Sequence, residues 1–496
     1  MEKVNQKGVS DRVALSLNEA NLLMDRAFES QKSIAEMEQV KVDRIVEAMA
    51  EAGYRNAWRL ADLAVEETGM GRVEDKTIKN QFATKNLYEY IRNMRTTGII
   101  KEDKLRGVVE IATPMGVVVG LTPTTNPTST VLFKAIIAMK SRNAIVLSPH
   151  PRAVKCSLEA ARIMEEAAVS AGAPRGLINC MSNVSLEATN ELLHHPKTSV
   201  VLATGGSNMV KAAYSSGNPA YGVGPGNVPV FIERTADIED AVSKIMLSKT
   251  FDNGTVCASE EAIVTETIIS QSVIQELENQ GGYFVKGSDI AALTKTAVKE
   301  NGALNPQIVG KSPKIIADLA GIDIPEGTKL LIVPLEGVGK DFPLSAEKLC
   351  PIIGLYIEKD WKDACFRCIE LINYGGLGHS MVMHSKNEEV IMEFAIKKPV
   401  SRILVNTPST HGAIGYTTGL APSMTLGSGT IGGSITSDNV TPMHLINIRR
   451  LAYHTMGREP KADGRTRGLF FTKAEITEAV QGIMEQRNRQ KAADYR

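Results

Sequence analysis

The chain has 496 residues, of which 43% are hydrophobic and 23% charged. A chain of this length exceeds what one hydrophobic core usually supports, so we expect two or three globular domains. Its 56 lysines and arginines balance its 56 aspartates and glutamates, so no net field attracts it to nucleic acid or to an anionic membrane. Because no segment approaches the roughly 18 consecutive apolar residues of a membrane span, and the start MEKVNQKGVSDR lacks the apolar region of a signal peptide, we expect a soluble cytoplasmic protein.

The N-terminal part is predicted to be helical over residues 18–95. Within it, Val42, Ile45, Val46 and Met49 recur with the i, i+3, i+4, i+7 spacing of an amphipathic helix. From about residue 116 the pattern changes to short apolar runs that alternate with helical stretches.

Two alternating series follow, and alternation of this kind builds a parallel sheet covered by helices on both faces. The apolar runs of the first series are 116–121, 144–147, 177–181 and 199–203, separated by helical stretches such as 128–140 and 153–171. Those of the second series are 262–265, 330–333, 352–356, 381–384 and 403–406. The segment FDNGTVCASE (251–260) lies between the two series, at a junction of the kind where ligand clefts form.

The six cysteines do not make a disulfide framework in a chain of this length. Cys365 and Cys368 form one C-x-x-C pair, which is either half of a metal or redox site or two cysteines one helical turn apart. Because no second pair completes a metal shell, we favour the helical interpretation and expect no metal site.

Cys257 is the cysteine whose surroundings suggest chemistry. Its neighbours Ala258 and Ser259 are small and leave the sulfur uncrowded, and Gly254 permits a tight turn. A thiol nucleophile needs its thiolate, which a positive potential or a helix N-terminus favours. Taken alone, the segment is also compatible with an ordinary core cysteine.

Three further segments carry candidate site residues. In VLATGGSNMVKAA (201–213) an apolar strand meets Gly205-Gly206-Ser207 and then a helix, whose free N–H groups could receive phosphate oxygens. In GLTPTTNPTST (120–130), Asn126 and the threonine hydroxyls could donate to a developing oxyanion, or Asn126-Pro127 could simply start a turn.

The third segment, YGGLGHSMVMH (374–384), places His379 after a glycine turn. A histidine there could move a proton near neutral pH, or it could be a structural histidine with satisfied ring nitrogens. The glycine-dense residues 412–433 lie further on, where the backbone could approach a ligand closely or form a surface loop.

Together, six segments resemble the CoA-acylating aldehyde dehydrogenases of the aldehyde dehydrogenase superfamily, and are similar to the aldehyde dehydrogenase half of bifunctional aldehyde–alcohol dehydrogenases and to microcompartment aldehyde dehydrogenases. The segments are ATPMGVVVGLTPTTNPTST, ATGGSNMVKAAYSSGNPAYGVGPGNVPVFI, SKTFDNGTVCASEEAIV, EKLCPIIGLY, GGLGHS and LAPSMTLGSGTIGGSITSDNVTPMHLIN. They extend from about residue 110 to residue 447.

The resemblance implies an α/β fold with two Rossmann-like domains and a small β oligomerisation flap, in a homodimer or homotetramer. The expected boundaries are 1–97 and 117–250 for the cofactor-binding domain, 251–434 for the catalytic domain, and 98–116 with 435–455 for the flap. Residues 456–496 would form a flexible tether and a C-terminal amphipathic helix, similar to helices that dock microcompartment enzymes on shell proteins. This similarity suggests that the protein lies inside a bacterial microcompartment. The alternative interpretations of the segment are a helix that packs on its own oligomer and the start of a fused second domain.

The resemblance also implies residue roles. Cys257 matches the nucleophile, which attacks an aldehyde to give a thiohemiacetal and then a thioacyl enzyme. Asn126, or its neighbour Thr125, falls where an oxyanion amide is found. The positions that match the site of the cofactor NAD are Pro123, Thr124, Ser148, Pro149, His150, Gly205, Gly206, Ser207 and Glu347.

The implied acyl acceptor is CoA. Hydrolytic relatives carry a glutamate that activates water where this sequence has Gly222, so a carboxylate base is missing there. His379 is then the best candidate for moving the protons of the CoA thiol, in a reaction that can also run from acyl-CoA to aldehyde. Lys211 replaces a glycine of the usual cofactor turn and no acidic residue follows Pro149, which leaves NADP open beside NAD.

Three functions are therefore weighed: CoA-acylating oxidation of a short-chain aldehyde, a CoA-independent aldehyde or semialdehyde dehydrogenase, and a non-catalytic structural protein. Gly222 argues against the second, and the presence of both Cys257 and His379 argues against the third. Acetaldehyde is the simplest substrate, and propanal and sulfoacetaldehyde remain alternatives.

Overall fold

The computed structural model describes residues 2–455 and residue 477. Its chain divides into two units, one made of residues 1–100 and 111–449 and the other of residues 101–110 with the chain from residue 450 onward. Every element of the candidate site lies in the first unit, which contains two parallel sheets.

The N-terminal part is helical, as the sequence predicts, and its first helix already begins at Glu2. In α2 the residues with helical spacing, Val42, Ile45, Val46 and Met49, are all buried. The helices are α1 (Glu2–Ile34), α2 (Gln39–Arg55), α3 (Ala57–Thr68), α4 (Val73–Gln81) and α5 (Leu87–Ile91), with a π-helical turn (Phe82–Asn86) between α4 and α5.

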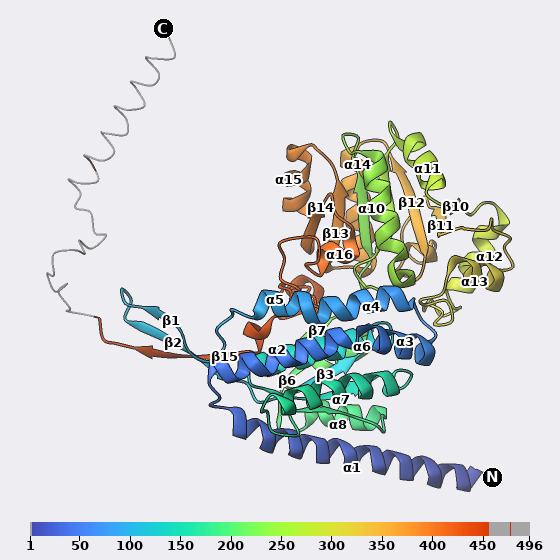
Figure 1. The fold of residues 1–496 in the computed structure, drawn as a ribbon. Coiled ribbons are helices and arrows are strands. Elements are labelled where there is room, and N and C mark those ends of the chain that lie inside the picture. Colours follow the sequence, from blue (N-terminus) through green and yellow to red (C-terminus); the bar gives the residue numbers. More distant parts are fainter. Residues whose placement is uncertain (1, 456–476, 478–496) are drawn as a thin grey trace. The chain divides into compact units, whose positions relative to one another are not determined.

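The first sheet has five strands in the order β5-β4-β3-β6-β7, all parallel. Helices α6 and α7 pack on each other, and α2 covers them (Figure 1). The strands are β3 (Val117–Thr122), β4 (Ala144–Pro149), β5 (Ile178–Cys180), β6 (Thr198–Thr204) and β7 (Ala220–Val223), and the helices are α6 (Pro127–Lys140), α7 (Val154–Ser170), α8 (Leu186–His194) and α9 (Ser207–Tyr214).

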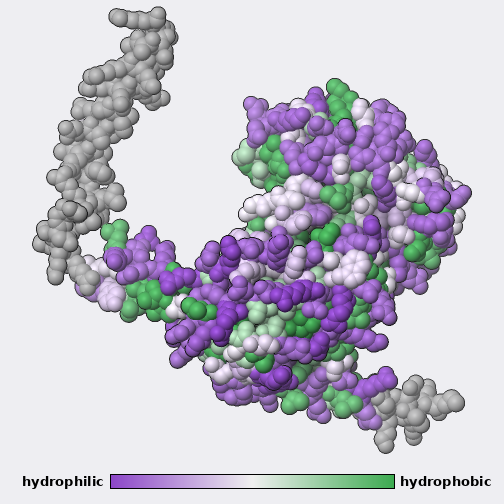
Figure 2. Space-filling view, viewed as in Figure 1, coloured by the Kyte–Doolittle hydropathy of each residue, from purple (hydrophilic) through white to green (hydrophobic). Residues whose placement is uncertain are grey.

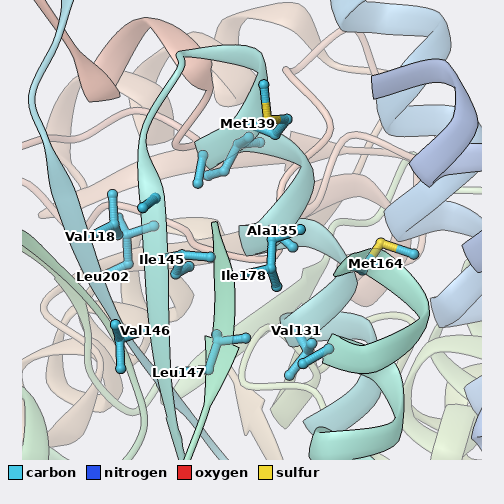
Figure 3. Packing of buried hydrophobic residues seen from close by; sticks show 14 of the residues in the cluster. Val118, Val131, Ala135, Met139, Ile145, Val146, Leu147, Met164, Ile178 and Leu202 are labelled. Atoms are coloured by element: carbon cyan, nitrogen blue, oxygen red, sulfur yellow. The ribbon is translucent and has the colours of Figure 1, made fainter. Parts of the chain in front are cut away.

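The core of this sheet is apolar on both faces. Every residue of β3 and β4 is buried, as expected for central strands of a parallel sheet between helices. Figure 3 shows Ile145 and Leu147 of β4 beside Val131 and Ala135 of α6. Burial on both faces explains why these strands read as continuous apolar runs in the sequence.

The second sheet has seven parallel strands in the order β10-β11-β12-β9-β8-β13-β14. The strands are β8 (Val228–Ile232), β9 (Glu260–Glu266), β10 (Gly282–Phe284), β11 (Leu330–Pro334), β12 (Ile352–Glu358), β13 (Gly378–His384) and β14 (Val400–Val405). The helices are α10 (Ile238–Thr250), α11 (Ser270–Asn279), α12 (Ser288–Ala297), α13 (Pro313–Ala320), α14 (Trp361–Gly375), α15 (Glu388–Lys397) and α16 (Ser409–Ala413).

Adjacent residues of its central strands belong to opposite faces. Val230 and Ile263 pack in the cluster that includes α10, whereas their neighbours Phe231 and Val264 pack in the cluster that includes α14. Cys365 and Cys368 are buried in α14, one helical turn apart, within this second cluster. The strands β7, β8 and β10 were not predicted, because they are short and the first two lie in a segment rich in glycine and proline.

A three-stranded sheet in the order β1-β2-β15 lies where the flap is expected, with strands β1 (Gly98–Asp103), β2 (Val108–Pro114) and β15 (Ile446–Ala452). Figure 2 shows apolar side chains on this part of the surface, and Leu105, Leu451 and Tyr453 of the second unit are exposed. The predicted tether and C-terminal helix (456–496) lie outside the described residues, apart from residue 477. No helix within the described part of the chain is long and apolar enough to cross a membrane.

Candidate active site

A cavity of about 510 Å³ lies where the strands of the five-stranded sheet end, and it reaches Cys257. Its wall is built from the turns that follow β3, β4 and β6, which is where parallel α/β sheets bind ligands. The predicted site residues that line it are Pro123, Thr124, Asn126, Ser148, Pro149, His150, Gly205, Gly206, Cys257 and Glu347.

The turn between β6 and α9 has room beside it. A side chain added at Gly206 would have no atom within 4 Å, so the backbone there borders open space. Gly206 caps α9, and Ser207 is the first residue of that helix, although its side chain lies outside the described residues. An open glycine turn at a helix start fits the phosphates of a dinucleotide.

Cys257 follows α10 and a tight turn, Phe251–Gly254. Asp252 and Asn253 have positive φ angles of 50° and 51°, which are unusual for residues with a side chain. Cys257 is partly exposed to the cavity, whereas Val256 and Ala258 beside it are buried. The bent backbone therefore presents the sulfur and hides its neighbours.

The thiol is not activated in the free protein. Burial, and then the Glu347 carboxyl, raise the pKa of Cys257 to about 12, against the opposing charges of Arg402 and Lys79. Burial, and then the charge of Glu261, raise the pKa of Glu347 itself to about 8, and the Gly226 N–H donates to Glu347 Oε1 at 3.0 Å. Glu347 is thus largely uncharged at neutral pH.

Asn126 immediately precedes α6 and faces the cavity. Its Oδ1 accepts a hydrogen bond from Lys79 Nζ at 2.6 Å, and its Nδ2 donates to the Thr255 carbonyl at 3.1 Å. The amide is therefore tied to the backbone two residues before Cys257.

A buried ion cluster beside Asn126 was missed by the sequence analysis. Lys76 and Lys79 of α4 both contact Asp252 Oδ2, and these three side chains are at most 3% exposed. The only signal was the pair of lysines three residues apart in VEDKTIKN, a spacing that is equally common on solvated helices.

His379 lies in β13 but does not line the cavity of Cys257. It borders a second cavity of about 470 Å³, and the two cavities share Gly224 and Pro225 in their walls. His379 is 1% exposed and neither ring nitrogen has a hydrogen-bond partner among the described residues. Burial, and then Arg402, lower its pKa to about 3, so the ring is neutral at pH 7 and a weak base in the free protein.

Gly226 permits the close approach of His379 to the cysteine. A Cβ at Gly226 would lie 2.3 Å from the Cys257 carbonyl and 3.1 Å from the His379 ring. The imidazole and the Cys257 backbone are therefore separated by a single glycine.

Arg402, in β14, is a buried cation without a carboxylate partner among the described residues. Its guanidinium makes five hydrogen bonds, including bonds of 3.2 Å to the His379 carbonyl and 2.6 Å to the Gly427 carbonyl. All five N–H donors are thereby engaged inside the protein.

Gly222, in β7, has no room for a side chain. A Cβ there would lie 2.7 Å from Val210 Cγ1 and 3.0 Å from the Tyr214 ring. The Tyr214 hydroxyl accepts from the Gly222 N–H at 2.8 Å. Val210 and Tyr214 thus together fill the space into which a side chain at residue 222 would project.

The profile of the aldehyde dehydrogenase family matches residues 2–303, more than half of the chain. The chain belongs to the aldehyde dehydrogenase family. Its five- and seven-stranded parallel sheets with a small third sheet are the fold that the resemblance implied.

Within this family the chain is similar to acylating enzymes. It is 51% identical to the crystallised acetylating aldehyde dehydrogenase of Geobacillus thermoglucosidasius, with a TM-score of 0.88 over 90% of this chain and 99% of that one. It is 45% identical over 88% of its length to the bifunctional aldehyde-alcohol dehydrogenase of Escherichia coli, and it spans about half the length of that curated relative, 49%. A propionaldehyde dehydrogenase of Rhodopseudomonas palustris, solved with bound CoA and an acylated cysteine, is 28% identical, with a TM-score of 0.78 over 88% of this chain and 97% of that one.

Among the described residues, no group of three or more histidine, cysteine, aspartate or glutamate side chains is arranged to hold a metal ion.

Proposed function

We propose that this aldehyde dehydrogenase oxidises a short-chain aldehyde, most simply acetaldehyde, and transfers the acyl group to CoA through Cys257. Two observations together support this proposal: the Cys257 thiol faces the cavity, and there is no room for a side chain at Gly222. Relatives named as acetylating or solved with CoA, described above, support it.

The cavity fits a nicotinamide dinucleotide. Gly205 and Gly206 would receive the phosphates, Ser148, Pro149 and His150 would border the adenosine, and Glu347 would hold the nicotinamide ribose. When bound, the cofactor supplies the two-electron acceptor that takes the aldehyde hydrogen as hydride. We propose NAD, with NADP as the alternative that a direct comparison of rates would reveal.

Cys257 would form and break the covalent bond to substrate. The Cys257 thiol gives its proton to a base, for which we propose the Glu347 carboxylate, as its sulfur adds to the aldehyde carbon. The Asn126 amide, which can release its bond to the Thr255 carbonyl, donates to the resulting oxyanion. After oxidation the acyl group remains on sulfur as a thioester. The CoA thiol then attacks that carbon, its proton goes to a basic group, and the Cys257 thiolate leaves.

His379 is proposed to take that proton once the bound, negatively charged CoA raises its pKa, which burial and Arg402 lower to about 3 in the free protein. Its ring is neutral, unpartnered and separated from the Cys257 backbone by Gly226 alone. Because His379 borders the second cavity, the proton would leave through that cavity.

CoA is favoured over water because nothing at residue 222 can activate water. Gly222 has no carboxylate, and Val210 and the Tyr214 ring fill the space a side chain would need. The thioester would therefore persist until a stronger nucleophile arrives.

A small neutral aldehyde is favoured over an anionic one. Lys79 and Arg402 are the cations whose charges act on Cys257, and both already donate to protein acceptors. Acetaldehyde is thus preferred to sulfoacetaldehyde, and propanal remains an alternative.

The test follows reduced cofactor with purified protein, NAD and acetaldehyde, with and without CoA. We expect sustained turnover only with CoA, at least tenfold above the rate without it, and no turnover for Cys257→Ala with an unchanged thermal midpoint. Equal rates with and without CoA would reject the acylating function. A panel with propanal, sulfoacetaldehyde and succinate semialdehyde then ranks the substrates by kcat/KM.

A further inference from the structure

The Lys79 ammonium is enclosed by three acceptors. Its Nζ donates to Asn126 Oδ1 at 2.6 Å, to Thr255 Oγ1 at 3.1 Å and to Asp252 Oδ2. An ammonium has three hydrogens and no acceptor, so these contacts use its full capacity. Lys79 is 3% exposed, so these contacts are shielded from bulk water.

This arrangement fixes which way the Asn126 amide points. A carboxamide can rotate by half a turn and exchange its oxygen with its nitrogen, and only the hydrogen-bond partners decide between the two. The ammonium can bond only the oxygen. The Nδ2 donors are therefore directed to the Thr255 carbonyl at 3.1 Å and the Thr125 hydroxyl at 3.2 Å, on the cavity wall.

The same ammonium adds positive charge beside the cysteine. Two ammonium groups, Lys76 and Lys79, share one fully buried carboxylate, Asp252. The half-buried Asp75 carboxyl accepts from the Asp252 N–H at 2.8 Å, and the His411 ring lies near Lys79. Lys79 is among the charges that lower the pKa of Cys257, against the larger effect of burial.

We infer that Lys79 is a positioning residue of the active site. It holds the Asn126 amide with its N–H donors on the cavity wall, where release of the bond to Thr255 frees one donor for the oxyanion that forms on the carbon bound to Cys257. The inference rests on the proposed chemistry at Cys257 but not on the acyl acceptor, because the same oxyanion forms whether water or CoA completes the reaction. Lys79 would act through Asn126, without touching substrate.

Lys76 provides a matched control. It is equally buried, belongs to the same helix and contacts the same Asp252 oxygen, but its other contact is the Thr125 carbonyl at 2.8 Å and not the Asn126 side chain. A variant at Lys76 therefore disturbs the ion cluster and leaves the Asn126 oxygen bonded to Lys79.

The experiment is a double-mutant cycle on NAD-linked acetaldehyde oxidation at saturating cofactor, with CoA present. We expect Lys79→Met and Asn126→Ala each to lower kcat at least tenfold, with KM for NAD changed less than twofold. The double variant should be no more than about twofold worse than the poorer single variant, because one residue acts through the other. Lys76→Met should lower the thermal midpoint as Lys79→Met does, while kcat falls less than threefold.

Any of three results would overturn the inference. They are losses of kcat that multiply in the double variant, an unchanged kcat in Lys79→Met, or a loss of kcat in Lys76→Met equal to that in Lys79→Met. If Lys79→Met does not fold, Asn126→Asp replaces it, since a carboxylate keeps the Lys79 contact but has no N–H donor. Asn126→Asp should then be more thermally stable than Asn126→Ala and equally inactive; equal stability of the two would mean that the contact is absent. If the wild-type enzyme turns over equally well without CoA, the acylating function is rejected. The double-mutant cycle can still be interpreted, because the same oxyanion forms whether water or CoA completes the reaction.

Discussion

Cys257 is held in a site that keeps its thiol protonated at neutral pH. Burial sets this state, and the Glu347 carboxyl strengthens it, so the thiol has a pKa raised to about 12. Such a cysteine resists oxidation and adventitious alkylation, because the thiolate is the reactive form. The two opposing cations, Arg402 and Lys79, are both engaged in hydrogen bonds within the protein.

A pH-dependent reactivity follows for the free protein. Alkylation of Cys257 by iodoacetamide should be slow at pH 7 and should rise continuously to pH 10, since the thiolate fraction grows tenfold per pH unit below the pKa of the thiol. Glu347→Gln should matter only above about pH 8, where the wild-type carboxyl is charged, and there it should speed alkylation. Peptide mass spectrometry, with Cys257→Ala as the blank, measures the rate; a plateau near pH 7 would contradict the expected protonation state.

The contact between Tyr214 and Gly222 predicts how the acyl acceptor is chosen. Gly222→Glu alone should destabilise the protein by about 1–3 kcal/mol through overpacking and should give no CoA-independent turnover. Adding Val210→Ala and Tyr214→Ala removes both side chains that the new Cβ would meet, and CoA-independent oxidation should then rise at least tenfold above wild type. Tyr214→Ala alone is the control and should show no rise; hydrolysis by Gly222→Glu alone would show that the tyrosine does not block the site.

At the scale of elements, the glycine-dense segment 412–433 packs directly on β13. A Cβ at Gly378, the first residue of β13, would lie 1.8 Å from the Ser428 carbonyl, and its φ of +74° belongs to the left-handed region. His379 is the next residue, and its carbonyl is tied to this region through Arg402, which also binds Gly427. The segment is thus part of the support of the histidine and not a free surface loop.

This support can be tested with two glycines of similar φ. Gly433 has a φ of +75° with nothing near its Cβ, so Gly433→Ala carries only the backbone penalty, roughly 1 kcal/mol. Gly378→Ala adds the collision and should lower the free energy of unfolding by at least about 3 kcal/mol. Urea unfolding compares them, and similar losses in the two variants would argue that the segment moves away without cost.

At the scale of the whole molecule, two parallel sheets bring distant parts of the chain to one cavity. Residues 126 and 206 follow the carboxyl ends of β3 and β6, whereas residues 257 and 347 precede β9 and β12 of the seven-stranded sheet. Lys79 of α4 joins them through its bond to Asn126. We retain the predicted domains as an interpretation of these sheets, with 1–97 and 117–250 for the cofactor, 251–434 for catalysis, and 98–116 with 435–455 as the flap.

The flap is proposed to mediate a homodimer or homotetramer. Leu105, Leu451 and Tyr453 are 84%, 46% and 52% exposed, and such a group of large apolar side chains marks an association surface. Replacing Leu105 and Leu451 by lysine should convert the oligomer to a monomer in light scattering. Lysine at the exposed Leu186 and Leu247, outside the flap, is the control; an unchanged mass in the flap variant would place the interface elsewhere.

The predicted C-terminal docking helix remains a proposal, since it lies outside the described residues. Fusing residues 456–496 to a fluorescent protein tests it: co-purification with microcompartment shell proteins supports the proposal, and a fusion that stays free rejects it. A location inside a microcompartment depends on that result.

The sequence by itself determined the alternation of helices and strands, the turn at Gly205-Gly206 and the candidacy of Cys257, because buried parallel strands and tight turns leave local patterns of apolar residues and glycine. Only the tertiary structure decided which side chains share a cavity. It places Lys79 in contact with Asn126 and the Tyr214 ring beside Gly222. It also places His379 in the wall of a second cavity, with Gly226 between its ring and the Cys257 backbone. Such contacts join residues that no local period connects, so they depend on how the sheets and helices pack.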